Sequence, residues 1–114
     1  MAEGVDTYIA EILVEFKMLL GYEIEVIAVI PYKHFEERRK RRSQERYRNI
    51  LGAIDDIIYT GEEYTSTALF IRNKYMVDNA NLVLAVYDNV KNGGTYNTLK
   101  YARSIGKDII IEEI

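Results

Sequence analysis

The chain has 114 residues, of which 48% are hydrophobic and 29% are charged, a balance typical of a single globular domain over residues 1–114. It contains no cysteine, which excludes disulfides, thiolate catalysis and cysteine-based zinc sites. A formal net charge of −3 argues against general nucleic-acid binding. With no apolar run of about 18 residues and no secretory leader, we expect a cytoplasmic protein without membrane contact.

The first part of the chain predicts a helix and then a buried strand. Residues 6–20 place apolar side chains on one helical face, with Asp6 or Thr7 as the N-cap. Residues 24–30 are apolar except for Glu25 and are rich in β-branched side chains, which predicts a buried strand. Pro31, the only proline, stops that strand.

A long polar helix is predicted for residues 35–55, with five consecutive cations at 38–42. Cations near the start of a helix oppose the helix macrodipole. One interpretation is a solvated face whose arginines pair with nearby glutamates. The other is that Arg38, Arg39 or Arg42 reaches a phosphate. His34 has no second histidine or cysteine to join it, so we expect no metal site.

The second part of the chain continues the alternation of strand and helix. Strands are predicted at 56–60, 82–87 and 108–112 from their short apolar, β-branched runs. Helices are predicted to begin near Tyr64 and Thr95. This pattern predicts an α/β fold, a Rossmann-like three-layer sandwich with a mostly parallel sheet. Ligands in such folds lie beyond the carboxyl ends of the strands.

One such end carries the sequence Gly93-Gly94-Thr95 between a strand and a helix. Glycines let backbone N–H groups approach a ligand without a Cβ in the way, and a helix N-terminus attracts anions. We interpret this stretch as a phosphate site. The alternative is a tight turn in which Thr95 only caps the helix.

Several motifs resemble, in order and spacing, the YpsA-like family of the SLOG superfamily, whose Rossmann-like domains are related to the LOG and DprA proteins. The motifs are Gly4-Val5-Asp6, Pro31-Tyr32, Arg72-Asn73-x-x-Met76-Val77-Asp78, the strand at 82–87 and Gly93-Gly94-Thr95. The resemblance implies a nucleotide-derived ligand at the carboxyl edge of the sheet, bound through loops at Gly4, Arg72 and Gly93.

The chain departs from this resemblance in two respects. YpsA-like proteins begin with a further strand, helix and strand, so we expect a domain that lacks the first β-α-β of the family. The related LOG phosphoribohydrolases carry a catalytic glutamate just inside the helix after the glycine loop. Here no carboxylate follows the loop until Asp108, so general acid chemistry of that type lacks its residue.

The first hypothesis is therefore a protein that binds an ADP-ribose, NAD or cyclic ADP-ribose type of ligand and does not convert it. We expect no catalytic residue, no catalytic cofactor and no metal. Arg72 and the glycine-loop amides would hold phosphates, an aspartate would accept ribose hydroxyls, and a tyrosine would stack on the base. The predicted ligand-binding residues are Gly4, Asp6, Pro31, Tyr32, Arg72, Asn73, Asp88, Gly93, Gly94, Thr95 and Tyr96.

Such a protein could sequester or sense a nucleotide signal, as a phage or mobile-element product would against a host defence. We expect a homodimer or larger homo-oligomer, because a sheet without its central strands exposes an edge or an apolar face. Two alternatives stay open. One is a LOG-type nucleotide or N-glycosidic-bond hydrolase that uses Glu3, Asp6 or Asp88. The other is a non-catalytic protein-interaction module.

Overall fold

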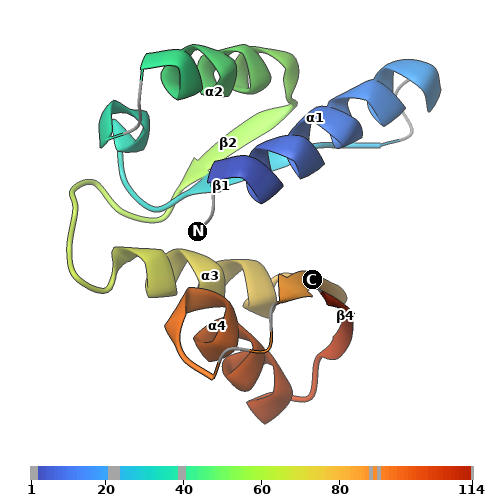
Figure 1. Ribbon diagram of the computed structural model, residues 1–114, viewed down its shortest axis with the longest axis vertical. Coiled ribbons are helices and arrows are strands. Elements are labelled where there is room, and N and C mark those ends of the chain that lie inside the picture. The colour runs from blue at the N-terminus through green and yellow to red at the C-terminus, as the bar shows by residue number, and fades with distance from the viewer. Residues whose placement is uncertain (1–2, 21–23, 39–40, 88, 90, 114) are drawn as a thin grey trace. The chain divides into compact units, whose positions relative to one another are not determined.

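The computed structural model describes residues 3–20, 24–38, 41–87, 89 and 91–113. Its contacts divide into two compact units, residues 2–63 and residues 64–114. Each unit combines helices with one pair of parallel strands (Figure 1), which confirms the predicted α/β class. The single domain over residues 1–114 stays a prediction.

The unit of residues 2–63 contains two longer helices, a short 3-10 helix and two strands. In chain order these are α1 (Glu3–Leu20), β1 (Ile27–Ile30), η2 (Phe35–Arg38), α2 (Arg41–Ala53) and β2 (Asp56–Tyr59). Strand β1 pairs with β2, and α1 packs against α2. The predicted helix over 35–55 is wrong in its first part, because 35–38 form a 3-10 turn and α2 begins at Arg41.

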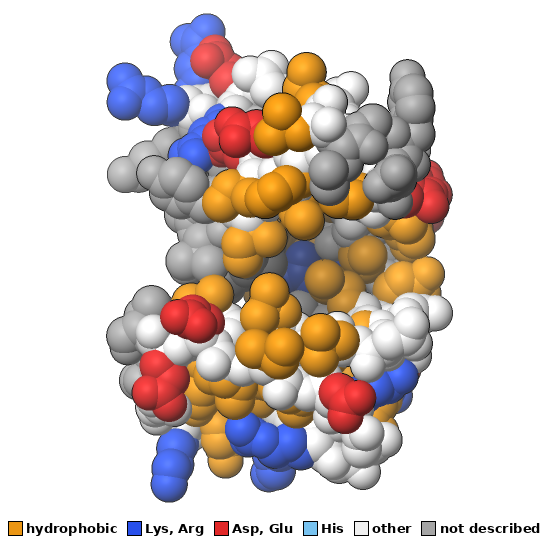
Figure 2. All heavy atoms as spheres, turned by 90° about the vertical axis from the view of Figure 1, so that its right-hand side faces the viewer, with side chains coloured by type: hydrophobic (Ala, Val, Ile, Leu, Met, Phe, Trp, Pro, Cys, Tyr) orange, Lys and Arg blue, Asp and Glu red, His pale blue; other side chains and the backbone are white. Residues whose placement is uncertain are grey.

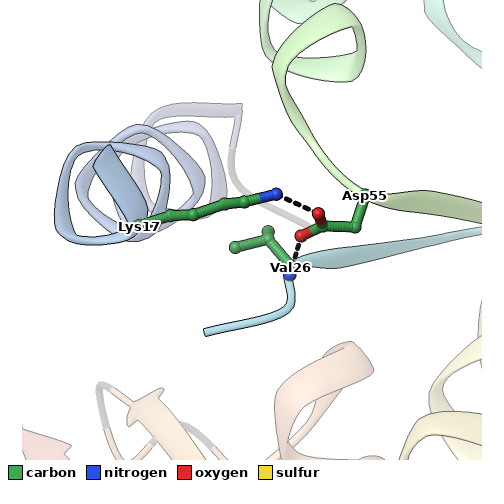
Figure 3. A network of polar contacts seen from close by, with 3 residues as sticks. All are labelled: Lys17, Val26 and Asp55. Carbon is green, nitrogen blue, oxygen red and sulfur yellow. Dashed lines mark hydrogen bonds and ion pairs between the residues drawn. The ribbon is translucent and has the colours of Figure 1, made fainter. Parts of the chain in front are cut away.

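Strand β1 begins three residues later than predicted, and the residues next to it show why. The backbone N–H of Val26 donates to the Asp55 carboxylate (N···Oδ2 2.6 Å), and the Asp55 N–H donates to the Val26 carbonyl at 2.9 Å (Figure 3). The Lys17 ammonium binds the other carboxylate oxygen. These two hydrogen bonds lower the pKa of Asp55, the bond from Lys17 more than the bond from Val26. Asp55 therefore joins α1 to the starts of both strands.

The unit of residues 64–114 alternates two helices with two strands. They are α3 (Ala68–Asp78), β3 (Leu82–Tyr87), α4 (Gly93–Ser104) and β4 (Asp108–Glu113). Strand β3 has the predicted bounds, and it pairs in parallel with β4. Helix α4 packs against α3 and both strands, and its inward residues Leu99 and Ala102 are almost completely buried.

Polar contacts hold the C-terminal end of α3. The Asp78 carboxylate accepts a hydrogen bond from the Tyr101 hydroxyl, which raises the pKa of Tyr101. The Lys107 ammonium, just before β4, donates to the carbonyls of Ala80 (2.8 Å) and Asp78 (3.4 Å). A cation at this position suits the negative end of the helix. The end of α3 is thus tied to both α4 and the approach to β4.

In the described part of the chain, no helix combines the length and apolar character needed to span a bilayer.

Candidate functional site

The turn that leads into α4 exposes its backbone at two adjacent glycines. Asn92 is extended and precedes the helix, and Gly93 follows with a φ of +86°, a conformation that favours glycine. A Cβ placed on Gly93 or Gly94 would meet no atom within 4 Å, and both residues are exposed. The first amides of α4 therefore have room for a ligand atom, and the macrodipole favours an anion there.

Thr95 does not cap this helix, contrary to the prediction. Helix α4 begins at Gly93 with Asn92 as its N-cap, so Thr95 is already the third helical residue, and its side chain is exposed. Tyr96 is half-buried beside it. The Thr98 hydroxyl donates to the Gly94 carbonyl at 2.8 Å. This side-chain bond helps to close the first turn directly behind the glycines.

Arg72 lies in the second turn of α3, in the same unit as the glycine turn. Helix α3 packs against α4, the helix that begins at the glycine turn. Arg72 is only 4% exposed, and its Nε donates to the Asn73 Oδ1 at 2.8 Å. Asn73 was predicted as a ligand-binding residue. Its hydrogen bond from Arg72 gives it a second role, which is to orient the guanidinium. No sequence pattern indicated this role.

Pro31 and Tyr32 directly follow β1 in the unit of residues 2–63. Both are buried, and the Tyr32 ring packs edge-on against Phe35, with 5.3 Å between ring centroids and 87° between planes. The Phe35 ring in turn packs against the ring of Tyr47 in α2, with 6.4 Å between the ring centroids. Tyr32 thus contributes to an aromatic cluster of its own unit. Its predicted stacking on a base stays a prediction.

The carboxyl ends of β1 and β2 are held close together. The Thr60 N–H donates to the Ile30 carbonyl at 3.0 Å. A Cβ on Gly61 would lie 2.8 Å from the Pro31 carbonyl oxygen. Glycine is thus required here by close approach. Beyond these ends, Lys33 pairs with Glu62 at 2.8 Å, and the hydrogen bond to that carboxylate raises the pKa of Lys33.

Gly4 and Asp6 are not in a loop, as the resemblance implied, because α1 begins at Glu3 and includes both. Both residues lie in the first turn of α1, whose amides have no acceptor within the helix, so the structure places them at a helix start. Asp88, predicted to accept a ribose hydroxyl, lies outside the described residues. Among the side chains that are described, no three His, Cys, Asp or Glu residues gather closely enough to hold a metal ion.

The predicted site residues therefore fall into two groups. Arg72, Asn73 and residues 93–96 share one unit, in which their helices α3 and α4 pack together. Gly4, Asp6, Pro31 and Tyr32 belong to the other unit. The first group supplies both an open helix start and an oriented cation, and it is the candidate site.

Parallel strands, flanking helices and a glycine turn at a strand's carboxyl end define an α/β protein of the Rossmann-like type. The family model described as YspA SLOG family, YpsA, matches residues 2–108, and the chain belongs to this family.

The relatives are bacterial. A UPF0398 protein of Bacillus cereus strain B4264 is 28% identical over 107 residues, which cover 91% of this chain and 57% of that protein. A UPF0398 protein of Brevibacillus brevis strain 47 is 28% identical over 92 residues, which cover 79% of this chain and 48% of that protein. The SPbeta prophage-derived protein YoqJ of Bacillus subtilis strain 168 is 29% identical over 92 residues, which cover 70% of this chain and 53% of that protein. The chain thus spans about half the length of the curated relatives it matches.

Proposed function

We propose that this protein binds a nucleotide-derived ligand of the ADP-ribose, NAD or cyclic ADP-ribose type and holds it without converting it. The observation that carries the proposal is the exposed turn at Gly93 and Gly94, whose amides open at the N-terminus of a 12-residue helix. A phosphate is the group that suits this environment best, because it accepts several N–H bonds and is stabilised by the helix macrodipole.

Arg72 supports the same ligand class. A guanidinium pairs with phosphate oxygens through a planar fork, and that geometry is most effective when the side chain is already oriented. The bond from Arg72 Nε to Asn73 supplies this orientation. A diphosphate would occupy the glycine turn with one phosphate and the arginine with the other. The nucleotide character of the ligand rests on family membership and the Rossmann-like arrangement.

The composition of α4 favours holding over cleaving. Glycosidic-bond hydrolysis needs a carboxyl group positioned to protonate or activate the reacting atoms. Helix α4 contains no acidic residue along its length, so the element nearest the proposed phosphate supplies no such group.

A binding protein that does not turn its ligand over acts by lowering the free ligand concentration or by reporting it. One relative, YoqJ, is a prophage-derived protein by its name. By analogy we propose that this chain sequesters or senses a nucleotide signal in the context of a phage or mobile element.

We also propose that the protein forms a homodimer or larger homo-oligomer. Leu82, Leu84 and Ile110, on the strand pair β3–β4, are at least half exposed. Apolar side chains gathered on a strand pair favour burial against another surface. Light scattering at micromolar concentration, with and without ligand, tests the assembly, and a stable monomer in both conditions contradicts it.

The binding proposal is tested by melting temperature and calorimetry with ADP-ribose, NAD and cyclic ADP-ribose, followed by chromatography of the recovered ligand. We expect at least one ligand to raise the melting temperature and to be recovered intact. Release of nicotinamide or free base would instead establish the hydrolase. No thermal shift with any of the three would favour an interaction module.

Two variants test the proposed ligand contacts, and circular dichroism of the buried Arg72 variant checks that its fold is kept. Gly94→Leu places a side chain where the structure has open space, in a helical turn that favours leucine over glycine, so stability should hold or rise while affinity falls. Arg72→Ala should weaken binding by about 1.5–3 kcal/mol if it removes a charge-assisted phosphate contact. Arg103→Ala, an exposed cation at the far end of α4, is the matched control and should bind normally.

A further inference from the structure

The basic segment is not used by the proposed nucleotide site. Residues 38–48 hold seven of the fifteen Lys and Arg residues and one of the eighteen Asp and Glu residues. The segment therefore carries +6 and the remainder of the chain carries −9. The net charge of −3, which argued against nucleic-acid binding, conceals this separation. A charge asymmetry of this size within one chain is typical of proteins that meet a polyanion.

The structure places part of this charge on the outward face of α2. The apolar residues Tyr47, Ile50 and Leu51 are half-buried on one side of the helix. Arg41, Arg42 and Arg48 are exposed on the opposite side, at positions that the helical period brings together. In the upper part of Figure 2, where α2 lies, basic side chains project outward. We call these three arginines the α2 arginine face.

The exposed Glu45 is three or four residues from each of these arginines and lies on the same side of α2, but no ion pair among the described side chains joins it to them. Arg46 points elsewhere and pairs with Glu11 of α1, which fastens the two helices together. Among the ion pairs of the described side chains, none involves Arg41, Arg42 or Arg48. The first turn of α2 also has no acidic residue, although two cations there oppose the macrodipole. Structural needs of the unit would favour the opposite charges at this position.

We propose that the α2 arginine face docks against the phosphate backbone of duplex DNA. Arg41 and Arg48 are seven residues apart, about 10.5 Å along the axis, close to the major-groove width of about 12 Å. The helix itself, about 10–12 Å across, fits that groove. Guanidinium groups bind phosphate oxygens through two parallel N–H bonds. Exposed Asn49 adds an amide group suited to base edges and phosphates, and the Gln44 Oε1 accepts a hydrogen bond from Arg48 Nη2 at 3.4 Å.

Fluorescence anisotropy with a labelled 20-base-pair duplex, from about 50 to 200 mM salt, tests the proposal. Arg41→Gln with Arg42→Gln removes two charges that the macrodipole disfavours, so this double variant should fold. We expect binding at least about tenfold weaker at low salt, and a log–log salt slope reduced by about 1.8, or about 0.9 for each lost contact. The matched control is Lys100→Gln with Arg103→Gln, which removes two exposed cations from α4 and should leave both quantities unchanged.

Three results would overturn the proposal. The first is an absence of duplex binding by the native protein at the lowest salt. The second is an equal loss in the α4 control, which would reduce the effect to net charge. The third is tighter binding of polyglutamate or of duplex RNA than of duplex DNA, which would assign the face to an acidic protein or to RNA. Circular dichroism of every variant shows that the fold is kept.

Discussion

The close approach between Gly61 and Pro31 makes a quantitative prediction for Gly61→Ala. The added Cβ would lie 2.8 Å from the Pro31 carbonyl oxygen, about 0.7 Å inside a favourable contact of about 3.5 Å. Both groups are fixed by backbone, and the Thr60 bonds to the Ile30 carbonyl at 3.0 and 3.4 Å must stretch if the strand ends move apart. Overpacking of this kind costs about 1–3 kcal/mol. Alanine stabilises by about 0.4–1 kcal/mol because it restricts the unfolded chain, so the expected net loss lies between about 0 and 2.6 kcal/mol, with a central value of about 1.3 kcal/mol.

Gly52→Ala is the matched control, because Gly52 is the last but one residue of α2 and a Cβ there meets no atom within 4 Å. That variant should be at least as stable as the native protein, by up to about 0.5–1 kcal/mol, the difference in helix propensity in a helix interior. Urea unfolding followed by circular dichroism measures both variants. Amide hydrogen exchange of β1 and β2 reports on the affected unit directly. If Gly61→Ala proves as stable as Gly52→Ala, the close approach is not a constraint and the reasoning fails.

Two further predictions concern other parts of the fold. Because its hydrogen bonds lower the folded-state pKa of Asp55, the stability that they contribute is present above its ordinary value near 3.9 and is lost as pH falls through the lowered folded value. The urea midpoint of Asp55→Ala should therefore fall less between pH 6 and pH 2 than the urea midpoint of the native protein does. An equal fall in both proteins would contradict this. Leu99→Ala should cost about 2–5 kcal/mol of unfolding free energy, since Leu99 is 1% exposed at the core of its unit. A loss below 1 kcal/mol in urea unfolding would show that the site collapses around the smaller side chain.

The strands could be predicted from sequence where their apolar runs had clear limits. Strand β3 has the predicted bounds because its apolar run starts after Asn81 and stops before Asp88. Strand β1 is shorter than predicted because an apolar pattern cannot show that the Val26 N–H is taken by a distant carboxylate. That contact joins residues 29 positions apart, and only the folded chain brings them together.

Helix starts and site contacts were harder to predict. The start of α4 at Gly93 was missed because Asn92 and Thr95 are both residue types favoured at an N-cap, and the sequence does not show which of them holds that position. The residue types of the candidate site were visible in the sequence, since glycines and an arginine are what a phosphate needs. The burial of Arg72 and its bond to Asn73 depend on packing, which no local pattern records.

Lys107 has a consequence for how this unit can change over evolutionary time. Its bonds to the carbonyls of Asp78 and Ala80 hold α3 beside the approach to β4 through contacts that bypass the connection from β3 to α4. Substitutions and insertions in that connection can therefore accumulate without loosening the opposite end. The turn at residues 79–81 is less tolerant of such changes, because it contains Ala80 and directly follows Asp78, whose carbonyls both accept from Lys107. The Lys107 contacts and the proposed ligand-binding turn thus lie at opposite ends of β3, so substitutions can alter one without altering the other.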